Sequence, residues 1–92
     1  MTIEELYQII IYRKKKMPND SYVASLFRDG EDRIIQKVGE EATEVVISAK
    51  NGKKERIIAE VADLQFHLLV LLAKFNITFE EVLEELDKRN KK

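Results

Sequence analysis

Two groups of acidic residues have a spacing that suits cation binding. Glu41 and Glu44 follow Glu40 in the stretch KVGEEATEVV, and Glu60 and Asp63 lie further along the chain. Residues at i and i+3 project from the same face of a helix, so each pair can offer its carboxylates together. Four carboxylates that face one another suit Mg²⁺ or Mn²⁺, which prefer oxygen ligands. The spacing therefore predicts a divalent cation site, whereas the first group alone reads more simply as a solvated charged stripe.

Basic and hydroxyl side chains lie close in sequence to the first acidic group. Lys37 has the spacing to pair with Glu40 and Glu41 on a helix surface. Cationic side chains and hydroxyl groups bind phosphate oxygens. The candidate anion contacts are Ser21, Ser25, Arg28, Gly30, Arg33 and Lys37, whereas the basic run at residues 13–16 is better explained as a solvated helix end.

His67 lies one helical turn beyond Asp63. This spacing permits a role as a metal ligand. The more favoured interpretation is a histidine that hydrogen-bonds a carboxylate or a carbonyl and thereby orients the site.

Helical periodicity accounts for most of the chain. Thr2 with Glu5, and Thr78 with Glu81, have the spacing of capping boxes, and Asn51-Gly52 is a helix-ending turn. The predicted helices cover about residues 2–15, 31–50, 53–75 and 79–90. Pro18 and the lack of a sustained period predict an ordered loop up to Gly30. The fold class is therefore all-α, with four helices and an antiparallel hairpin around Asn51-Gly52.

The two hairpin helices differ in their apolar surface. The helix at 31–50 has one broad apolar face, formed by Ile34, Ile35, Val38, Ala42, Val45, Val46 and Ala49. The helix at 53–75 is apolar around nearly its whole circumference, so we expect it to be buried on most sides. Its embedded carboxylates must then be paired, protonated or bound to a cation. Counting outward from the turn predicts Glu44 and Glu60 at similar height.

The composition narrows the class of protein. The 92 residues suit one domain (1–92) with a modest core, and a formal net charge of −1 gives no general attraction to nucleic acid or anionic lipid. The chain has no cysteine, and its polar N-terminal stretch does not resemble a signal peptide. We expect a cytoplasmic protein that binds neither nucleic acid nor membrane.

Three stretches resemble a known family. SYVASLFRDGEDRIIQKVGEEATEVVISAKN, EVADLQFHLLVLL and VLEELDKR, which span about residues 20–89, are similar in order and separation to phosphoribosyl-ATP pyrophosphohydrolases. This family catalyses the second step of histidine biosynthesis and is related to MazG-type proteins. The resemblance implies a four-helix, MazG-like bundle subunit in a tight homodimer. A chain of this length has no room for the cyclohydrolase domain fused to many relatives, so a separate enzyme would act on the product.

The resemblance also implies roles for particular residues. The Mg²⁺ ligands would be Glu41, Glu44, Glu60 and Asp63, with Mn²⁺ as a substitute. Either Glu40 or Glu44 would accept the proton of the attacking water, and Lys37 and Arg33 would stabilise the leaving pyrophosphate. The residues expected to contact phosphate or ribose are Ser21, Ser25, Arg28, Arg33, Lys37 and Arg89.

Two alternatives remain open from the sequence. One is a pyrophosphohydrolase of other nucleotides, such as dUTP or dCTP, with the same metal site and a different base pocket. The other is a non-catalytic helical dimerisation module whose carboxylates are only solvated.

Overall fold

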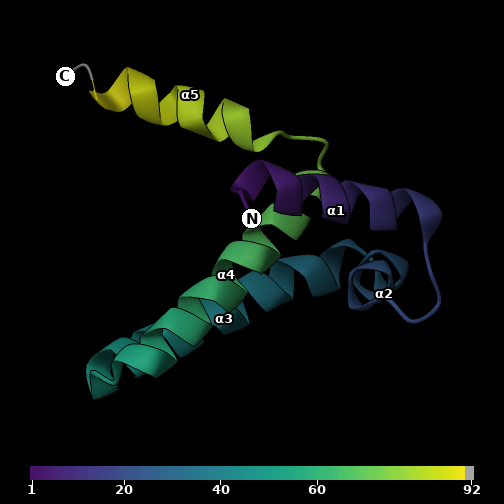
Figure 1. Ribbon diagram of the computed structural model, residues 1–92. Helices are drawn as coiled ribbons and strands as arrows, with labels where there is room; N and C mark the ends of the chain where they lie inside the picture. Colours follow the sequence, from purple (N-terminus) through teal and green to yellow (C-terminus); the bar gives the residue numbers. More distant parts are fainter. Residues whose placement is uncertain (91–92) are drawn as a thin grey trace.

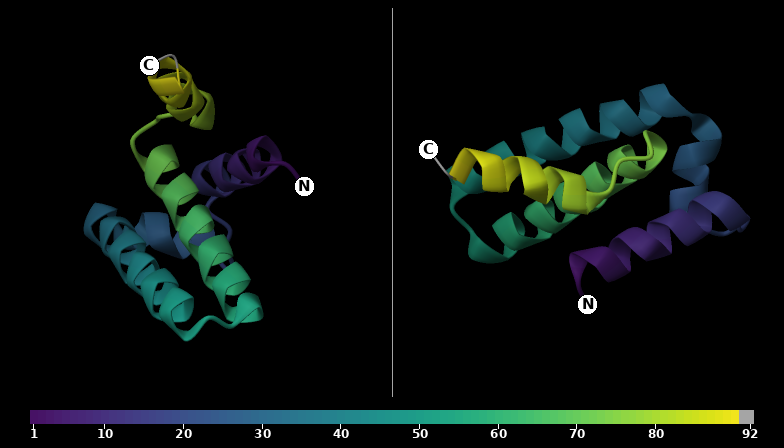
Figure 2. Two further views of the ribbon diagram at one scale, coloured as in Figure 1. Left: turned by 90° about the vertical axis from the view of Figure 1, so that its left-hand side faces the viewer. Right: turned by 90° about the horizontal axis from the view of Figure 1, so that it is seen from above.

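The computed structural model describes residues 1–90 as a set of helices, with no β-strand among them. Figure 1 shows the helices in chain order, and Figure 2 gives two further views. Their bounds are α1 Ile3–Lys16, α2 Tyr22–Asp29, α3 Glu31–Asn51, α4 Lys54–Lys74 and α5 Phe79–Asn90. The all-α prediction is confirmed, and the four predicted helices are present within one or two residues of their expected ends.

Local capping sets several of these helix ends. The Thr2 hydroxyl accepts from the Glu5 amide at 3.0 Å, and the Glu5 carboxylate accepts from the Thr2 amide at 2.8 Å. Thr78 and Glu81 make the same reciprocal pair at the start of α5, at 3.2 Å each way. Both predicted capping boxes are confirmed, because each depends only on residues three positions apart.

The predicted loop between α1 and α3 is wrong, because α2 occupies most of it. The Ser21 hydroxyl accepts from the Ala24 amide at 3.1 Å and caps the helix, and Gly30 ends it with a positive φ of 103°. Val23 and Leu26 are buried on its inner side. A helix of eight residues is not stable by itself, so packing against α1 and α3 decides the conformation of this segment.

The long helices α3 and α4 form an antiparallel hairpin, as predicted (Figure 1). Gly52 adopts a left-handed φ of 75° and its amide donates to the Ser48 carbonyl at 3.0 Å, which ends α3. The similar height of Glu44 and Glu60 stays a prediction, and Glu44 is not a member of the carboxylate group that Glu60 joins. Glu44 shares a pocket with Arg56, and Glu60 lies opposite Glu41.

The hydrophobic core lies where α1, α2 and the C-terminal half of α4 meet the start of α3. Its buried members are Tyr7, Ile10, Val23, Leu26, Ile34, Leu69, Val70 and Ala73. The core therefore anchors α2 and the start of α3 against α4. It leaves the far end of the hairpin as two helices packed mainly on each other.

The expectation that the helix at residues 53–75, which is α4, would be buried on most sides is wrong for this single chain. On α4, Ile58 is 59% exposed and Val61 is 46% exposed. The apolar face of α3 is also only partly covered, because Val46 remains 62% exposed. Each hairpin helix has an apolar face wider than its neighbour can cover. None of the helices within residues 1–90 combines the length and apolar character needed to cross a membrane.

Tyr7 provides a test of the packing between α1 and the chain before α5. Its hydroxyl donates to the Ile77 carbonyl at 2.7 Å, and burial, together with the charges of Glu4 and Glu81, raises its pKa. Tyr7→Phe leaves that carbonyl without its partner, so we expect it to lower the free energy of unfolding by about 1 kcal/mol at neutral pH. Urea unfolding with circular dichroism measures the loss.

The pH dependence of this difference has a defined sign. The raised pKa means that the folded state keeps the Tyr7 proton, so the contribution is present below the ordinary pKa of 10.0. It is lost as the pH rises from there through the raised pKa of the folded state. The stability gap between the wild type and Tyr7→Phe should therefore shrink in alkaline solution, and a constant gap would contradict this.

Candidate active site

Three carboxylates from α3 and α4 come together across the hairpin. Oxygen atoms of Glu41, Glu60 and Asp63 all lie within 4.8 Å of one another. Ligand oxygens on opposite sides of an octahedral Mg²⁺ are about 4.2 Å apart, from metal–oxygen distances of 2.0–2.1 Å. Small side-chain rotations would bring the three carboxylates onto one such ion. The donor set, which contains oxygen alone, therefore fits Mg²⁺ or Mn²⁺.

The environments of these three carboxylates differ. Glu60 is only 7% exposed, and the Arg56 guanidinium donates to it at 2.8 Å. Glu41 is partly buried and lies 3.3 Å from the Lys37 ammonium. Asp63 is exposed, which corrects the expectation that both acidic residues of α4 are embedded. Because Asp63 faces water, the cluster is open to a ligand from solution.

Lys37 connects the carboxylate cluster to Glu40. Burial lowers the pKa of the Lys37 ammonium, but its hydrogen bonds to Glu41 and Glu40 raise that pKa above the ordinary value. Hydrogen bonds from Gln36 and Lys37 hold the pKa of Glu40 below its ordinary value. Glu40 is therefore held by two side chains of its own helix.

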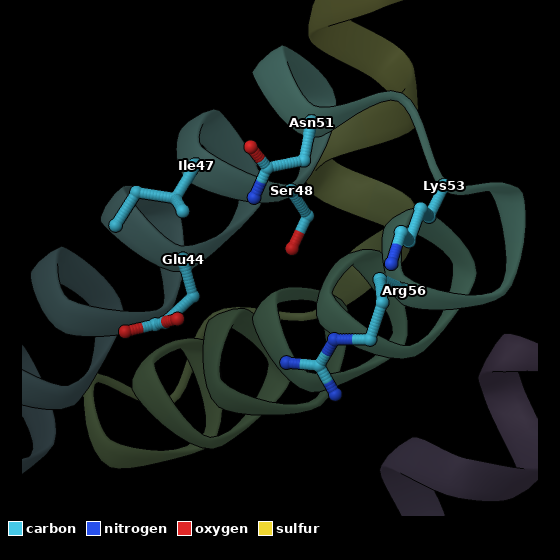
Figure 3. A pocket seen from close by; sticks show the side chains of 6 residues that line it. All are labelled: Glu44, Ile47, Ser48, Asn51, Lys53 and Arg56. Atoms are coloured by element: carbon cyan, nitrogen blue, oxygen red, sulfur yellow. The ribbon is translucent and has the colours of Figure 1, made fainter.

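Glu44 does not join the group of three carboxylates and instead lines an adjoining pocket. The pocket has a volume of about 540 Å³, and its walls come from the ends of α3 and α4 (Figure 3). Its lining residues are Glu44, Ile47, Ser48, Asn51, Lys53 and Arg56. Glu44 therefore lies between the carboxylate cluster and a polar pocket, with no cationic partner in the described residues.

Tyr22 of α2 contacts two aromatic residues of α4, Phe66 and His67, next to Asp63. The Tyr22 hydroxyl lies 3.0 Å from Nε2 of His67, and Nδ1 of His67 lies 2.8 Å from the Asp63 carbonyl oxygen. The Tyr22 ring also stacks on Phe66, with 6.1 Å between ring centroids. His67 is 5% exposed. The prediction that His67 hydrogen-bonds a carbonyl is confirmed.

These contacts fix the tautomer of His67. A carbonyl oxygen can only accept, so Nδ1 must carry the proton and Nε2 must accept from the Tyr22 hydroxyl in the neutral ring. His67 is the sole histidine in the chain, so its ring nitrogens are unambiguous in long-range ¹H–¹⁵N spectra. We expect the Nδ1–H tautomer in the wild type. Tyr22→Phe should change the Nε2 shift, and an unchanged shift would contradict the contact.

The remaining predicted phosphate contacts are more dispersed. Arg33 pairs with Asp29, and its guanidinium lies 5.9 Å from the centre of the Tyr22 ring. The Ser25 hydroxyl donates to the Tyr22 carbonyl at 2.6 Å. The Ser21 hydroxyl is also engaged, because it caps α2. Arg28 is exposed at the end of α2, and Arg89 pairs with Glu85 on α5. The structure therefore brings Lys37 into contact with the cluster and leaves Arg89 on a separate helix.

Sequence reasoning missed the polar groups on the hairpin side of the cluster. None of Ser48, Asn51, Lys53 and Arg56 was considered as a ligand contact. One available signal was the i, i+4 spacing of Arg56 and Glu60. The pocket itself depends on the register of the hairpin.

The fold and the site together define a small all-helical protein with a cluster of three carboxylates that could hold a metal ion. The family model described as "Phosphoribosyl-ATP pyrophosphohydrolase" matches residues 3–90. The chain belongs to this family.

Curated relatives agree with this assignment. A protein of Pelotomaculum thermopropionicum named phosphoribosyl-ATP pyrophosphatase is 51% identical over 98% of this chain and 92% of its own length. A protein of the same name from Geobacter sulfurreducens is 51% identical over 95% of this chain and 81% of its own. A third protein of this name, from Methanocella arvoryzae, is 45% identical over 97% of this chain and 96% of its own length. The similarity therefore extends over nearly the whole length of these proteins.

Proposed function

We propose that this chain hydrolyses phosphoribosyl-ATP at the carboxylate cluster with the help of a divalent cation, Mg²⁺ in the first place. The reaction is that of the family, which gives phosphoribosyl-AMP and pyrophosphate in histidine biosynthesis. The observation that supports the site is the meeting of Glu41, Glu60 and Asp63 across the hairpin. When bound there, Mg²⁺ would neutralise phosphate oxygens and help to activate water.

We propose that Glu44 is the general base that accepts the proton of the attacking water. Glu44 is one of the residues that line the pocket (Figure 3), whereas Glu40 is held by Gln36 and Lys37. The water oxygen forms a bond to the α-phosphorus, the bond between that phosphorus and the bridging oxygen breaks, and the pyrophosphate leaves with the electron pair. Glu44 takes the proton released by the water. Lys37 and Arg33, on the α2 side of the cluster, would contact the substrate's phosphate oxygens.

Glu44→Gln and Glu40→Gln separate the two candidate bases. Removing a general base costs about 10²–10⁴-fold in rate, so Glu44→Gln should lower kcat by at least about 100-fold. Glu40→Gln removes the same charge at a neighbouring position and should retain activity within about tenfold. Steady-state assays of pyrophosphate release measure both. The reverse order of effects would transfer the role to Glu40.

We also propose that two copies of the chain form a homodimer. The Cα radius of gyration is 14.4 Å, larger than the roughly 12 Å expected of a globular domain of this length. The exposed apolar residues of α4 and α5 include Ile58, Val61, Leu83 and Leu86. A second copy would cover this surface.

The product, phosphoribosyl-AMP, would pass to a separate cyclohydrolase.

The proposed function is tested with purified protein and a panel of substrates. Phosphoribosyl-ATP, dUTP and dCTP are each incubated with and without Mg²⁺, and pyrophosphate release is followed. We expect Mg²⁺-dependent release from phosphoribosyl-ATP and little from the other nucleotides. Comparable turnover of dUTP would indicate a pyrophosphohydrolase of broader substrate range, and release that does not depend on a divalent cation would contradict the metal site.

A further inference from the structure

The pocket at the hairpin end of the cluster has the chemistry of an anion site. Ser48 and Asn51 contribute polar groups from α3, Lys53 and Arg56 contribute two cations from the start of α4, and Glu44 contributes one carboxylate (Figure 3). Ile47 is its one apolar lining residue, and no aromatic side chain lines it. The lining therefore suits a highly charged ligand better than a purine base, which needs apolar or aromatic contact.

The two cations of the pocket are available in different ways. Lys53 is exposed and forms no ion pair within residues 1–90. Arg56 donates to Glu60, which is also a member of the carboxylate cluster. A divalent cation at the cluster would compete for the Glu60 oxygens. The Arg56 guanidinium, which is planar and presents several donors, could then turn to phosphate oxygens in the pocket.

Backbone and hydroxyl donors add to this site. Ser48 is only 4% exposed, yet its hydroxyl points into the space between the helices (Figure 3). The start of α4 has no side-chain cap. Uncapped amide groups at a helix N-terminus, together with the helix dipole, favour an anion. The Ser48 hydroxyl and the two cations thus line one pocket, next to the start of α4.

We infer that this pocket binds the pyrophosphate that leaves in the reaction, in contact with Lys53, Arg56 and Ser48. This inference rests on the proposed function, and it moves the leaving group away from Lys37 and Arg33. Those two residues precede Glu41 on α3, towards α2, and the pocket follows it, towards the hairpin turn. The substrate would lie along α3 with its β- and γ-phosphates towards the turn and its nucleoside towards Tyr22.

The test measures binding of inorganic pyrophosphate in the presence of Mg²⁺ by calorimetry, without any turnover. Lys53→Ala should weaken pyrophosphate binding by about tenfold, which corresponds to about 1.4 kcal/mol. Arg56→Lys keeps a charge beside Glu60 but loses the planar guanidinium, and should weaken binding by a similar factor. Lys54→Ala is the matched control, because Lys54 is the next residue, is exposed and does not line the pocket.

Three outcomes would overturn the inference. The first is that the wild-type protein does not bind pyrophosphate. The second is that the pocket variants bind pyrophosphate as tightly as the wild type. The third is that Lys54→Ala loses as much pyrophosphate affinity as the pocket variants. Lys37→Met provides a further comparison. If only this variant loses pyrophosphate affinity, pyrophosphate binds on the α2 side of the cluster and the inference is wrong. A wild type that binds pyrophosphate in the pocket but does not hydrolyse phosphoribosyl-ATP would instead contradict the proposed function.

Discussion

Asp63→Asn is expected to remove cation binding and to lower kcat/KM for phosphoribosyl-ATP by at least about 100-fold, which is about 2.7 kcal/mol of transition-state stabilisation. Asp63 is the exposed member of the three-carboxylate cluster, and its side chain makes no hydrogen bond within residues 1–90. The contact with His67 uses the Asp63 carbonyl and survives the substitution. The change therefore alters a ligand without disturbing the packing around it.

Thermal unfolding separates this loss from misfolding. A cation at 100 times its dissociation constant stabilises a folded protein by about 2.7 kcal/mol, which corresponds to roughly 10–20 °C in Tm for a domain of this size. The wild type should show a Mg²⁺-dependent rise of this order and Asp63→Asn little or none. Without Mg²⁺ the variant should be as stable as the wild type or slightly more so, because one like charge is gone.

A matched variant controls for the change in net charge. Glu84→Gln removes one negative charge from an exposed position on α5 that lines none of the described pockets. It should retain both the Mg²⁺-dependent rise in Tm and the activity. An Asp63→Asn protein that is still stabilised by Mg²⁺ like the wild type would exclude Asp63 as a ligand.

Substitution of the exposed apolar face should convert a dimer to monomers. Leu86 on α5 is 53% exposed, and Ile58 on α4 is 59% exposed. In the proposed homodimer both side chains are covered, so a glutamate at either position would bury an unpaired charge at a cost of several kcal/mol. We expect sedimentation equilibrium to give a dimer for the wild type and monomers at micromolar concentration for Leu86→Glu and Ile58→Glu.

Tyr12→Glu is the control for this experiment. Tyr12 is 59% exposed on α1, a helix that contributes none of the residues of the proposed interface, so the variant should remain dimeric. The wild type should also show a Tm that rises with protein concentration, which the monomeric variants lose. A wild-type protein that sediments as a monomer at all concentrations would refute the homodimer.

Residues close in sequence could be predicted to act together, and those predictions were accurate. The capping boxes at Thr2 and Thr78 involve side chains three residues apart. The Lys37 pairs with Glu40 and Glu41 likewise follow from helical spacing. The same reasoning placed Glu60 and Asp63 on one face of a helix. Each feature depends on the local geometry of a helix, which is the same wherever the helix lies.

The segment at residues 22–29 could not be assigned by the same means. Its helix is too short to be stable alone, and Val23 and Leu26 gain their burial from α1 and α3. The signals were present, since Ser21 precedes the segment and Gly30 follows it. These two signals were given less weight than the lack of a sustained apolar period. A segment of eight residues is too short to show such a period.

The sequence by itself determined that this chain is helical, that its carboxylates occur in i, i+3 pairs, and which family it resembles. Only the tertiary structure decided which carboxylates meet. Glu41 meets Glu60 and Asp63 across the hairpin, and Glu44 lines the pocket with Arg56. The physical reason is that helical spacing fixes direction around one axis, whereas the height of one helix against another depends on the turn at Gly52 and on side-chain packing along the hairpin.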